Sequence, residues 1–315
     1  MRECHGDLHL GNIAVIDDKP VPFDCIEFNA QLRWIDVMSE IAFLIMDLQD
    51  RRHDGLAWRF LNRYLEATGD YPGLAVLRFY LVYRALVRAK VHLTRAQQPR
   101  LARTETTRLT LAFRDYLRLA QSYTAPDQAA LIITHGLSGC GKTSATQLLA
   151  ELLGAIRLRS DLERKRLHGI APLSASGSAL TRGIYTRSAT AATYRRLAEL
   201  AQSIVKMRHS VIVDATFLKR AEREAFRGIA EWMDVPFFIL NFKAPLGVLR
   251  ARVAARRARG DDPSEADLSV LDYQIAAREP LTPAEMTVAI AVDGTCPPSR
   301  EMWQPLIARL RPANI

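Results

Sequence analysis

The sequence predicts an α/β fold, in which a mostly α-helical first part precedes a parallel sheet flanked by helices. Five short, β-rich apolar runs after residue 129 alternate with helical stretches, a pattern typical of βαβ crossovers. Between about residues 36 and 121, apolar residues instead recur at helical spacing. The polar, proline-containing stretch 122–128 separates the two patterns. We therefore expect a helical domain over residues 1–121, a linker over 122–128 and an α/β domain over 129–315.

The first domain is expected to contain one β-hairpin followed by helices. Two apolar runs, NIAVI and VPFDCI, are separated by the turn-like DDKP and predict a hairpin over residues 13–26. From about Asp36 the apolar residues repeat at i, i+3 and i+4, which favours amphipathic helices. The helical stretches are IDVMSEIAFLIMDLQD, GLAWRFLNRYLEATGD, GLAVLRFYLVYRALVRAKVHL and TTRLTLAFRDYLRLAQSY.

The second domain is expected to contain five parallel strands. The first of them ends at a glycine and leads into a helix over KTSATQLLAELLG, for which Gly154 is a candidate C-cap. Ligands bind at the carboxyl ends of the strands in such folds, so we expect the functional residues there. The strand candidates are ALIITHG, AIRLRSD, SVIVDAT, PFFILNF and MTVAIAVDG.

Composition and charge narrow the classes of protein that fit. The chain has 315 residues, of which 43 are Lys or Arg and 34 are Asp or Glu, giving a net charge of +9. No apolar run is long enough for a membrane span, and no pattern of an export signal is apparent. The four cysteines lack the spacing of a metal site or a disulfide framework. We expect a cytoplasmic protein without a membrane partner.

The basic charge favours an anionic partner, either nucleotide phosphates or a nucleic acid. Many of the arginines, as in RARVAARRARG, recur on helix faces and equally fit an ordinary solvated surface. No basic stripe interleaved with aromatic residues is apparent. A nucleic acid partner is therefore compatible with the charge but not favoured.

The stretch GLSGCGKT, Gly136–Thr143, matches the phosphate-binding pattern G-x-x-x-x-G-K-[ST] in full. It follows a buried strand and opens a helix, so backbone N–H groups and the helix dipole can converge on phosphate oxygens. Lys142 is expected to reach the β- and γ-phosphates of a nucleotide, and Thr143 to offer its hydroxyl to Mg²⁺. The expected nucleotide-binding residues are Gly136, Ser138, Gly139, Cys140, Gly141, Lys142, Thr143 and Ser144.

Two further strand ends carry candidate catalytic residues. Asp214 ends the strand SVIVD and is placed to serve a Mg²⁺ ion, although such an Asp can also cap the next helix. Asp161 follows the strand AIRLR and could accept a proton from a substrate hydroxyl, with Arg164 binding substrate or the transferring phosphate. An ordinary helix N-cap at Asp161, followed by surface basic residues, explains the same pattern.

A basic helix and a polar segment follow the fourth strand. The stretch LRARVAARRARGDDPSEAD, residues 249–267, carries five arginines and could form a lid that closes over phosphates. Arg252 and Arg256 lie one helical turn apart on one face, and Arg256 is the candidate catalytic arginine. For most of these arginines a solvated helix face is the competing interpretation.

Four motifs together carry a family resemblance: GLSGCGKT, RSDLERKRLHG, VIVDATFLKRAERE and ARGDDPSEADLSVLDYQ. Over about residues 128–295 the chain resembles the P-loop kinase domain of a bacterial family of bifunctional phosphotransferase/ATPase proteins. That family is related to gluconate-kinase-like, zeta-toxin-like and polynucleotide-kinase-like enzymes. The resemblance implies an ATP- and Mg²⁺-dependent kinase with Asp161 and Arg164 in the substrate site. It does not name the phosphate acceptor.

In the same family an aminoglycoside-phosphotransferase-like domain comes first, and residues 1–120 resemble the C-terminal lobe of that kinase-like domain. Within HGDLHLGN, the resemblance makes Asp7 the catalytic base and Asn12 a Mg²⁺ ligand. It makes Asp24 the second metal-binding carboxylate, and Asp36 a buried Asp that holds the catalytic loop.

The lobe that would hold the glycine-rich loop and its lysine is expected before His5, where this sequence has four residues. We therefore expect a truncated first domain that is catalytically silent, with Asp7, Asn12 and Asp24 as vestiges. The face that would pack on the missing lobe is expected to be exposed and partly apolar, and thus a candidate surface for self-association.

The sequence leaves three functions open. The leading one is an ATP-dependent kinase that phosphorylates a hydroxyl group of a small molecule or of a nucleoside- or sugar-type acceptor. The second is a kinase acting on nucleic acid 5′-hydroxyls or on a nucleotide sugar. The third is a nucleotide-dependent ATPase switch or scaffold, which would have no need of an acceptor-side acid or base at Asp161.

Overall fold

The computed structural model describes residues 1–125, 128–174, 176, 183–259 and 262–310, without the side chains of residues 257 and 259. Residues 126 and 127 of the expected linker lie outside this description. The chain divides into two compact units. The first comprises residues 1–65 and 70–126, and the second comprises residues 66–69 and 127–315.

The first unit begins with two small antiparallel pairs of strands. The predicted hairpin is confirmed: β2 (Ile13–Ile16) pairs with β3 (Lys19–Pro22). Its two-residue turn has Asp17 and Asp18 at φ 49° and 58°. Positive φ at both central residues is what the right-handed twist of a tight hairpin requires, and Asp tolerates it better than most residues. The other pair joins β1 (Arg2–Glu3) to β4 (Trp34–Ile35).

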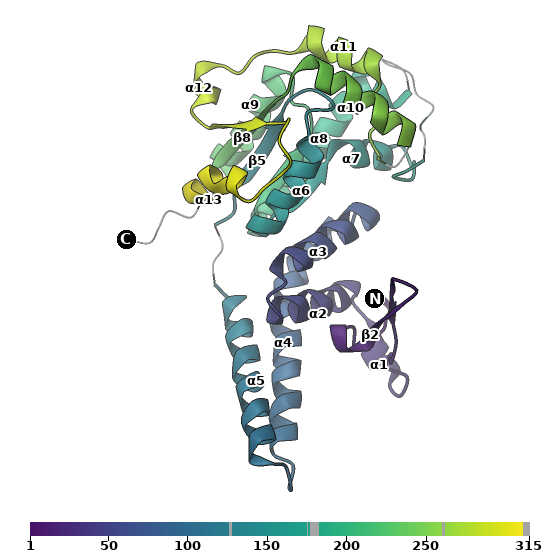
Figure 1. Cartoon of the computed structure of the whole chain (residues 1–315), viewed down its shortest axis with the longest axis vertical. Coiled ribbons are helices and arrows are strands. Elements are labelled where there is room, and N and C mark those ends of the chain that lie inside the picture. The colour runs from purple at the N-terminus through teal and green to yellow at the C-terminus, as the bar shows by residue number, and fades with distance from the viewer. Residues whose placement is uncertain (126–127, 175, 177–182, 260–261, 311–315) are drawn as a thin grey trace. The chain divides into compact units, whose positions relative to one another are not determined.

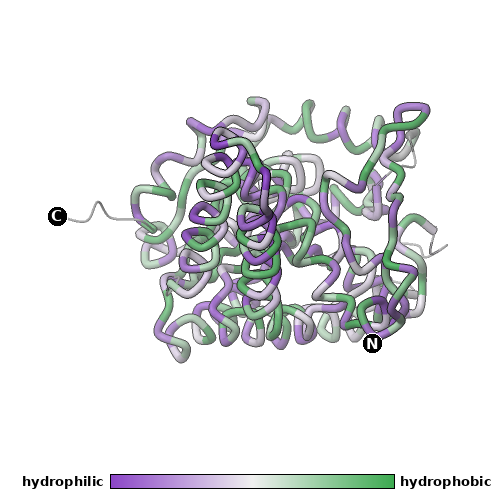
Figure 2. Tube along the Cα trace, turned by 90° about the horizontal axis from the view of Figure 1, so that it is seen from below, coloured by the Kyte–Doolittle hydropathy of each residue, from purple (hydrophilic) through white to green (hydrophobic). Residues whose placement is uncertain are grey.

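Helices make up the rest of the first unit, as predicted. The helix α2 is buried along most of its length, from Met38 to Leu48, and α4 packs against both α2 and α5. The tube in Figure 2 alternates between polar and apolar residues along its helical coils, as expected of helices with one buried face. The helices are η1 (Leu10–Asn12), α1 (Ala30–Arg33), α2 (Val37–Asp50), α3 (Asp54–Thr68), η2 (Tyr71–Gly73), α4 (Leu74–Ala96) and α5 (Arg103–Ser122).

The second unit is built on a five-stranded, wholly parallel sheet, which confirms the α/β prediction. The strand order is β6-β7-β5-β8-β9, so the strand that precedes the phosphate-binding pattern lies at the centre. All five predicted strands are present. They are β5 (Leu131–His135), β6 (Ile156–Arg159), β7 (Val211–Asp214), β8 (Phe237–Lys243) and β9 (Ala289–Asp293).

Helices cover the sheet of the second unit (Figure 1). One layer of the core joins Leu149 of α6 and Trp303 beside α13 to Ile132 and Leu240 of the sheet. The helix α8 contacts β6 and β7, and α9 contacts β5 and β8. Gly154 ends α6 at φ 69°, as predicted for a left-handed C-cap. The helices are α6 (Lys142–Leu153), α7 (Ser160–Leu167), η3 (Gly183–Tyr185), α8 (Arg187–Lys206), α9 (Arg220–Trp232), α10 (Leu246–Arg259), α11 (Leu268–Ala277), α12 (Pro283–Met286), η4 (Glu301–Trp303) and α13 (Gln304–Leu310). Among the described residues, no helix combines the length and the apolar character that a membrane crossing requires.

Candidate active site

The loop between β5 and α6 is a tight turn that depends on glycines at two positions. Gly139 and Gly141 adopt φ values of 84° and 85°, in the left-handed region that glycine enters at little cost. A Cβ atom on Gly139 would lie 2.8 Å from the carbonyl oxygen of Leu249. The predicted pattern thus folds as a curled backbone that leads directly into the N-terminus of α6.

The side chain of Lys142 folds back over this loop. Its Nζ donates to the carbonyl oxygen of Gly136 at 2.9 Å and to that of Leu137 at 2.8 Å. Cys140 is 1% exposed, and its Sγ lies 3.6 Å from the same ammonium. The ammonium of Lys142 therefore lies against the loop backbone, and a bound phosphate would compete with two carbonyl oxygens for it.

Two residues from α10 and α11 also contact the loop. The backbone N–H of Ser138 donates to Oε1 of Gln274 at 2.8 Å. Nη1 of Arg252 donates to the carbonyl oxygen of Gly139 at 3.4 Å and to that of Gly294. Gln274 was not predicted as a site residue, because a single polar residue in a helix does not indicate a contact with a distant loop.

Arg252 rather than Arg256 reaches the loop in this structure. Nη2 of Arg256 donates to the carbonyl oxygen of Ala266 at 3.2 Å, which ties α10 to the segment before α11. Within the expected lid, residues 260 and 261 and the side chains of residues 257 and 259 lie outside the described part of the chain. Arg256 remains a predicted catalytic residue, and Arg252 joins it as a second candidate.

The other loop residues are placed by the first turn of α6. Thr143 is half-buried and Ser144 is exposed, while Ser138 is buried. Nη1 of Arg157 on β6 donates to the carbonyl oxygen of Thr143 at 2.9 Å, which links the start of α6 to the neighbouring part of the sheet. The sequence therefore brings the predicted nucleotide-binding residues together at one turn.

Asp214 lies buried at the carboxyl end of β7. It is 5% exposed, and its Oδ2 has no hydrogen-bond partner among the described residues. The next residues approach the loop, because the backbone N–H of Gly136 donates to the carbonyl oxygen of Thr216 at 3.1 Å. A buried carboxylate oxygen without a partner is costly, which points to a cation or a donor that completes the site.

Arg159 lies beside Asp214 in the register of β6 and β7. It also forms an ion pair with Asp262, with 3.2 Å between Nη2 and Oδ2. Burial opposes the charge of Arg159, but the carboxylates of Asp214 and Asp262 outweigh it and raise the pKa of the guanidinium. The strand edge thus carries a positive charge next to the buried carboxylate.

Asp161 occupies the first turn of α7, at the carboxyl end of β6. The N-cap position belongs to Arg159, so the helix-cap interpretation of Asp161 is wrong. Within the described residues, no hydrogen bond engages its half-buried carboxylate. Burial raises the pKa of Tyr185, and the negative charges of Asp161 and Glu265 raise it further. Asp161 is therefore an available carboxylate at the edge of the sheet.

Arg164 is buried and makes contacts within the protein. Its Nη1 donates to the carbonyl oxygen of Ile184 at 3.0 Å and to Oγ1 of Thr190 at 3.3 Å. Its guanidinium lies 5.2 Å from the ring centre of Tyr185. These contacts tie α7 to η3 and α8, so part of the hydrogen-bonding capacity predicted for substrate serves the fold.

The site predicted in the first unit is only partly assembled. Nδ2 of Asn12 lies 3.1 Å from Oδ2 of Asp7, and His9 lies 3.4 Å from the same oxygen. The hydrogen bond with His9 lowers the pKa of Asp7. Asp24 is exposed at φ 60°, next to Phe23, whose backbone N–H donates to the carbonyl oxygen of Asn12 at 2.9 Å. Among the described residues, no hydrogen bond joins the carboxylate of Asp24 to Asp7 or Asn12. No group of three or more His, Cys, Asp and Glu in the described part of the chain is placed to hold a metal ion.

The role expected of Asp36 falls to other residues of α2. Asp36 is the N-cap of α2 and accepts from the backbone N–H of Met38 at 2.8 Å. Glu40 accepts from the N–H of Gly6 at 3.1 Å, and Asp47 from the N–H of Leu10 at 2.8 Å. The prediction for Asp36 was wrong, because the loop that contains Gly6 and Leu10 packs against α2 one and three turns after Asp36.

The chain is similar to proteins of Mycobacterium bovis and Mycobacterium tuberculosis that are described as uncharacterized. Each match is 30% identical over 303 residues and covers 95% of this chain and 57% of the relative. The chain thus spans little more than half the length of these relatives.

Three solved structures each match 59% of the chain. They are a sugar kinase from Janibacter sp. (23% identity, 96% of that chain, TM-score 0.43), a gluconokinase from Sinorhizobium meliloti (23%, 94%, 0.41) and a putative kinase from Chloroflexus aurantiacus (22%, 98%, 0.46). This likeness concerns the fold and is too distant to carry over an activity. Residues 131–281, which hold the phosphate-binding loop and the carboxylates of Asp161 and Asp214, match the family model of an AAA domain.

Proposed function

We propose that the second unit is an ATP-dependent kinase that transfers a γ-phosphate to a hydroxyl group of a small molecule. The observation that carries this proposal is the order of three adjacent strands. Asp161 follows β6, Asp214 ends β7, and the loop with Lys142 follows β5, so all three lie at one edge of the sheet. Both carboxylates have oxygens left free by the described residues.

The loop supplies what a triphosphate needs. Its left-handed glycines curl the backbone into the start of α6, and the N-terminus of that helix adds positive charge. Lys142 would exchange two carbonyl oxygens for phosphate oxygens, which gives stronger, charge-assisted hydrogen bonds. Arg252, already at the loop, adds a second cation.

A Mg²⁺ ion fits the residues present. Magnesium prefers hard oxygen ligands and keeps several waters. The unpartnered Oδ2 of buried Asp214, at the end of β7, and the hydroxyl of Thr143, in the first turn of α6, are such ligands. When bound with the nucleotide, the ion supplies neutralisation of phosphate charge.

Asp161 acts on the acceptor in this proposal. Its carboxylate would orient the acceptor hydroxyl and take its proton while that oxygen bonds to the γ-phosphorus. The bond between the γ-phosphorus and the β,γ-bridging oxygen breaks, and ADP leaves with the bonding electron pair. A lid arginine, Arg252 or Arg256, would steady the charge of the transferring group. Arg164 would contribute through the positioning of α7.

The first unit is inferred not to transfer phosphate in this chain. Asp7 and Asn12 are joined by a hydrogen bond, whereas among the described residues no hydrogen bond joins the exposed Asp24 to either of them. Asp7→Asn should therefore leave phosphoryl transfer unchanged, whereas Lys142→Ala should abolish it. Transfer that survives the loss of Lys142 and disappears with Asp7 would reverse this assignment.

The kinase proposal is tested by incubating the full chain with labelled ATP and a set of acceptors. One arm holds hydroxyl-bearing metabolites, and another holds 5′-hydroxyl oligonucleotides. Asp161→Asn should abolish product formation while ATP still binds, and Asp272→Asn, at an exposed surface ion pair, should change neither. Slow ATP turnover that is equal in wild type and Asp161→Asn, without any phosphorylated product, would instead support an ATPase switch.

A further inference from the structure

A pocket lies next to the phosphate-binding loop, on the other side of β5 from Asp214 and Asp161. It has a volume of about 390 Å³, within the range of small-ligand pockets. The ends of β5 and β8, the loop residues Leu137 and Cys140, and the segment 278–286 line it. Because β8 and β7 flank β5 on opposite sides, the pocket lies across β5 from the carboxylates of Asp214 and Asp161, while it borders the phosphate-binding loop through Leu137 and Cys140.

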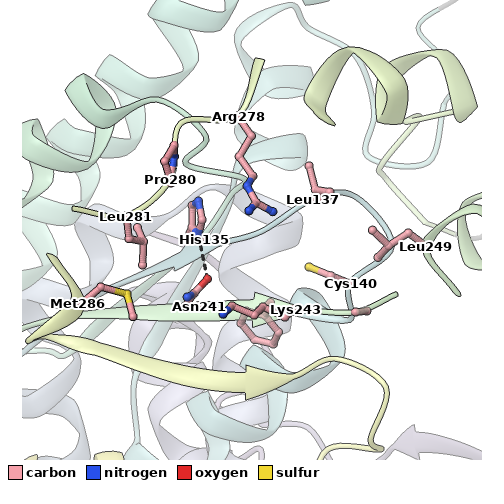
Figure 3. A pocket seen from close by; sticks show the side chains of 12 residues that line it. His135, Leu137, Cys140, Asn241, Lys243, Leu249, Arg278, Pro280, Leu281 and Met286 are labelled. Atoms are coloured by element: carbon pink, nitrogen blue, oxygen red, sulfur yellow. Dashed lines mark hydrogen bonds between the residues drawn. The ribbon is translucent and has the colours of Figure 1, made fainter. Parts of the chain in front are cut away.

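His135 is a buried side chain that presents an unsatisfied atom at this pocket. It is 4% exposed, and its Nδ1 lies 3.0 Å from Oδ1 of Asn241 (Figure 3). Since that amide oxygen only accepts, Nδ1 carries the hydrogen and Nε2 has a free lone pair. Nε2 has no partner among the described residues. Because unpartnered buried polar atoms are rare, Nε2 points to a ligand that donates a hydrogen bond.

The charge of the pocket is positive. Arg278 extends its guanidinium toward the space between His135 and Leu137, and Lys243 lines the same pocket (Figure 3). None of the described residues that line it is acidic. The neighbouring Glu279 instead accepts from Nζ of Lys219 and from the backbone N–H of Arg220. An anionic group therefore suits the pocket, with apolar atoms of the ligand against the leucines and Met286.

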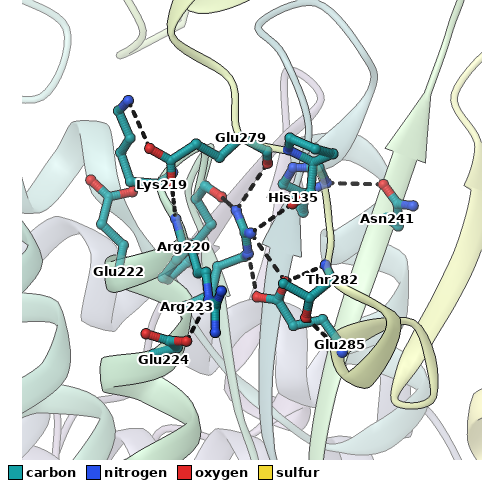
Figure 4. Close-up of polar contacts among 12 residues, drawn as sticks. His135, Lys219, Arg220, Glu222, Arg223, Glu224, Asn241, Glu279, Thr282 and Glu285 are labelled. Atoms are coloured by element: carbon teal, nitrogen blue, oxygen red, sulfur yellow. Dashed lines mark hydrogen bonds and ion pairs between the residues drawn. The ribbon is translucent and has the colours of Figure 1, made fainter.

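The wall of the pocket is held rigidly by Arg223 of α9. This arginine is 1% exposed and pairs with Glu285, with Nε and Oε1 2.6 Å apart. It also donates to the carbonyl oxygens of Phe217, Glu279 and Pro280 (Figure 4). Both charges of the pair are buried and fully engaged, so the segment that carries Arg278 is fixed in place before any ligand binds.

From this geometry we propose that the pocket binds a small organic anion that carries a hydroxyl group. Arg278 holds its carboxylate or phosphate group, and Nε2 of His135 accepts the hydrogen of its hydroxyl. This ligand is additional to the nucleotide and to the phosphate acceptor, and its binding does not require phosphoryl transfer.

Calorimetric titration of the full chain at pH 7.5, without nucleotide, tests the proposal with matched anions. Malate and succinate differ by one hydroxyl group, as do lactate and propionate, while glycerol phosphate and inorganic phosphate form the phosphate arm. We expect the hydroxylated member of at least one pair to bind at least tenfold more tightly than its partner. Whether the carboxylates or the phosphates bind identifies the anionic group that the pocket prefers. Binding should persist in saturating Mg²⁺-ATP. No binding of any probe, or displacement by ATP, would overturn the proposal.

Variants separate the two contacts. Arg278→Met should weaken binding at least tenfold, whereas Arg227→Met, at an exposed ion pair of α9, should not change it. His135→Gln should remove the preference for the hydroxylated anion. Equal weakening by the two arginine variants would show nonspecific attraction and contradict the assignment. His135 is buried, so His135→Gln can fail to fold. Arg278 is exposed, so Arg278→Met is expected to fold and still tests the proposal.

Discussion

The backbone N–H of Ser138 donates a hydrogen bond of 2.8 Å to Oε1 of Gln274. A residue of α11 thus occupies one of the loop donors that a triphosphate would use. Lys142 shows the same competition, since carbonyl oxygens of the loop hold its ammonium. The phosphate-binding loop is already curled, while the Ser138 N–H and the Lys142 ammonium are hydrogen-bonded to other groups of the protein.

Gln274→Leu is expected to strengthen ATP binding by freeing the Ser138 donor. A neutral hydrogen bond contributes about 1 kcal/mol, which corresponds to roughly a fivefold lower Kd. Fluorescence titration with a labelled ATP analogue measures it, and Tyr273→Phe, on the exposed neighbouring residue, serves as the control. An unchanged or higher Kd for Gln274→Leu would mean that this amide does not bind phosphate.

Gly139→Ala is expected to reduce both stability and nucleotide affinity. The residue has φ 84°, and its new Cβ would meet the carbonyl oxygen of Leu249. Positive φ alone costs about 1–2 kcal/mol for a residue other than glycine. Gly228→Ala, within α9 and with no atom near its added Cβ, should instead be neutral or stabilising. Chemical denaturation compares the two, and equal effects would contradict the strained-turn interpretation.

Asp214→Asn is expected to remove the Mg²⁺ dependence of ATP binding. The variant keeps the shape of the side chain but loses the charge of its unpartnered oxygen. ATP affinity should then be the same with Mg²⁺ and with EDTA, whereas wild type should bind more tightly with Mg²⁺. The control is Asp293→Asn, because Asp293 also ends a strand but is exposed and accepts from Thr295. Retained Mg²⁺ dependence in Asp214→Asn would place the ion elsewhere.

The stability of the protein is expected to fall in acid partly through His135. Burial, and then the nearby charges of Arg223 and Arg278, lower the pKa of its imidazole. Above about pH 6.5 neither the folded nor the unfolded state binds this proton. Below it the unfolded chain takes up the proton first, so the free energy of unfolding decreases by up to about 1.4 kcal/mol per pH unit until the folded-state pKa is reached.

Urea denaturation at pH 7.5 and 5.5 measures this contribution. His135→Gln should lose less stability between the two values than wild type does. His168→Gln, on an exposed residue, should behave like wild type. Parallel pH dependences for all three proteins would show that His135 is protonated equally in the folded and unfolded states.

Local patterns were sufficient for most of the fold. Period and turn residues predicted the hairpin, the strands and the left-handed cap at Gly154, because each depends on neighbours in sequence. They also placed the loop of Lys142 and the strand-end position of Asp214, since both follow from where a strand ends.

Contacts between distant segments could not be predicted in this way. Gln274 lies 136 residues from Ser138, and the pairing of His135 with Asn241 depends on the order of the strands. Which of Arg252 and Arg256 contacts the phosphate-binding loop depends on how α10 packs on that loop. The two arginines are one helical turn apart, and only Arg252 reaches the loop.

The most direct test of the account is calorimetric titration of Mg²⁺-ATP into wild type and Lys142→Ala, with Lys206→Ala at an exposed site of α8 as the control. Removal of the charged hydrogen bonds of Lys142 should weaken binding roughly 10- to 100-fold, while the control should match wild type. ATP affinity that is the same in all three proteins, or no Mg²⁺-dependent affinity in any of them, would contradict the account.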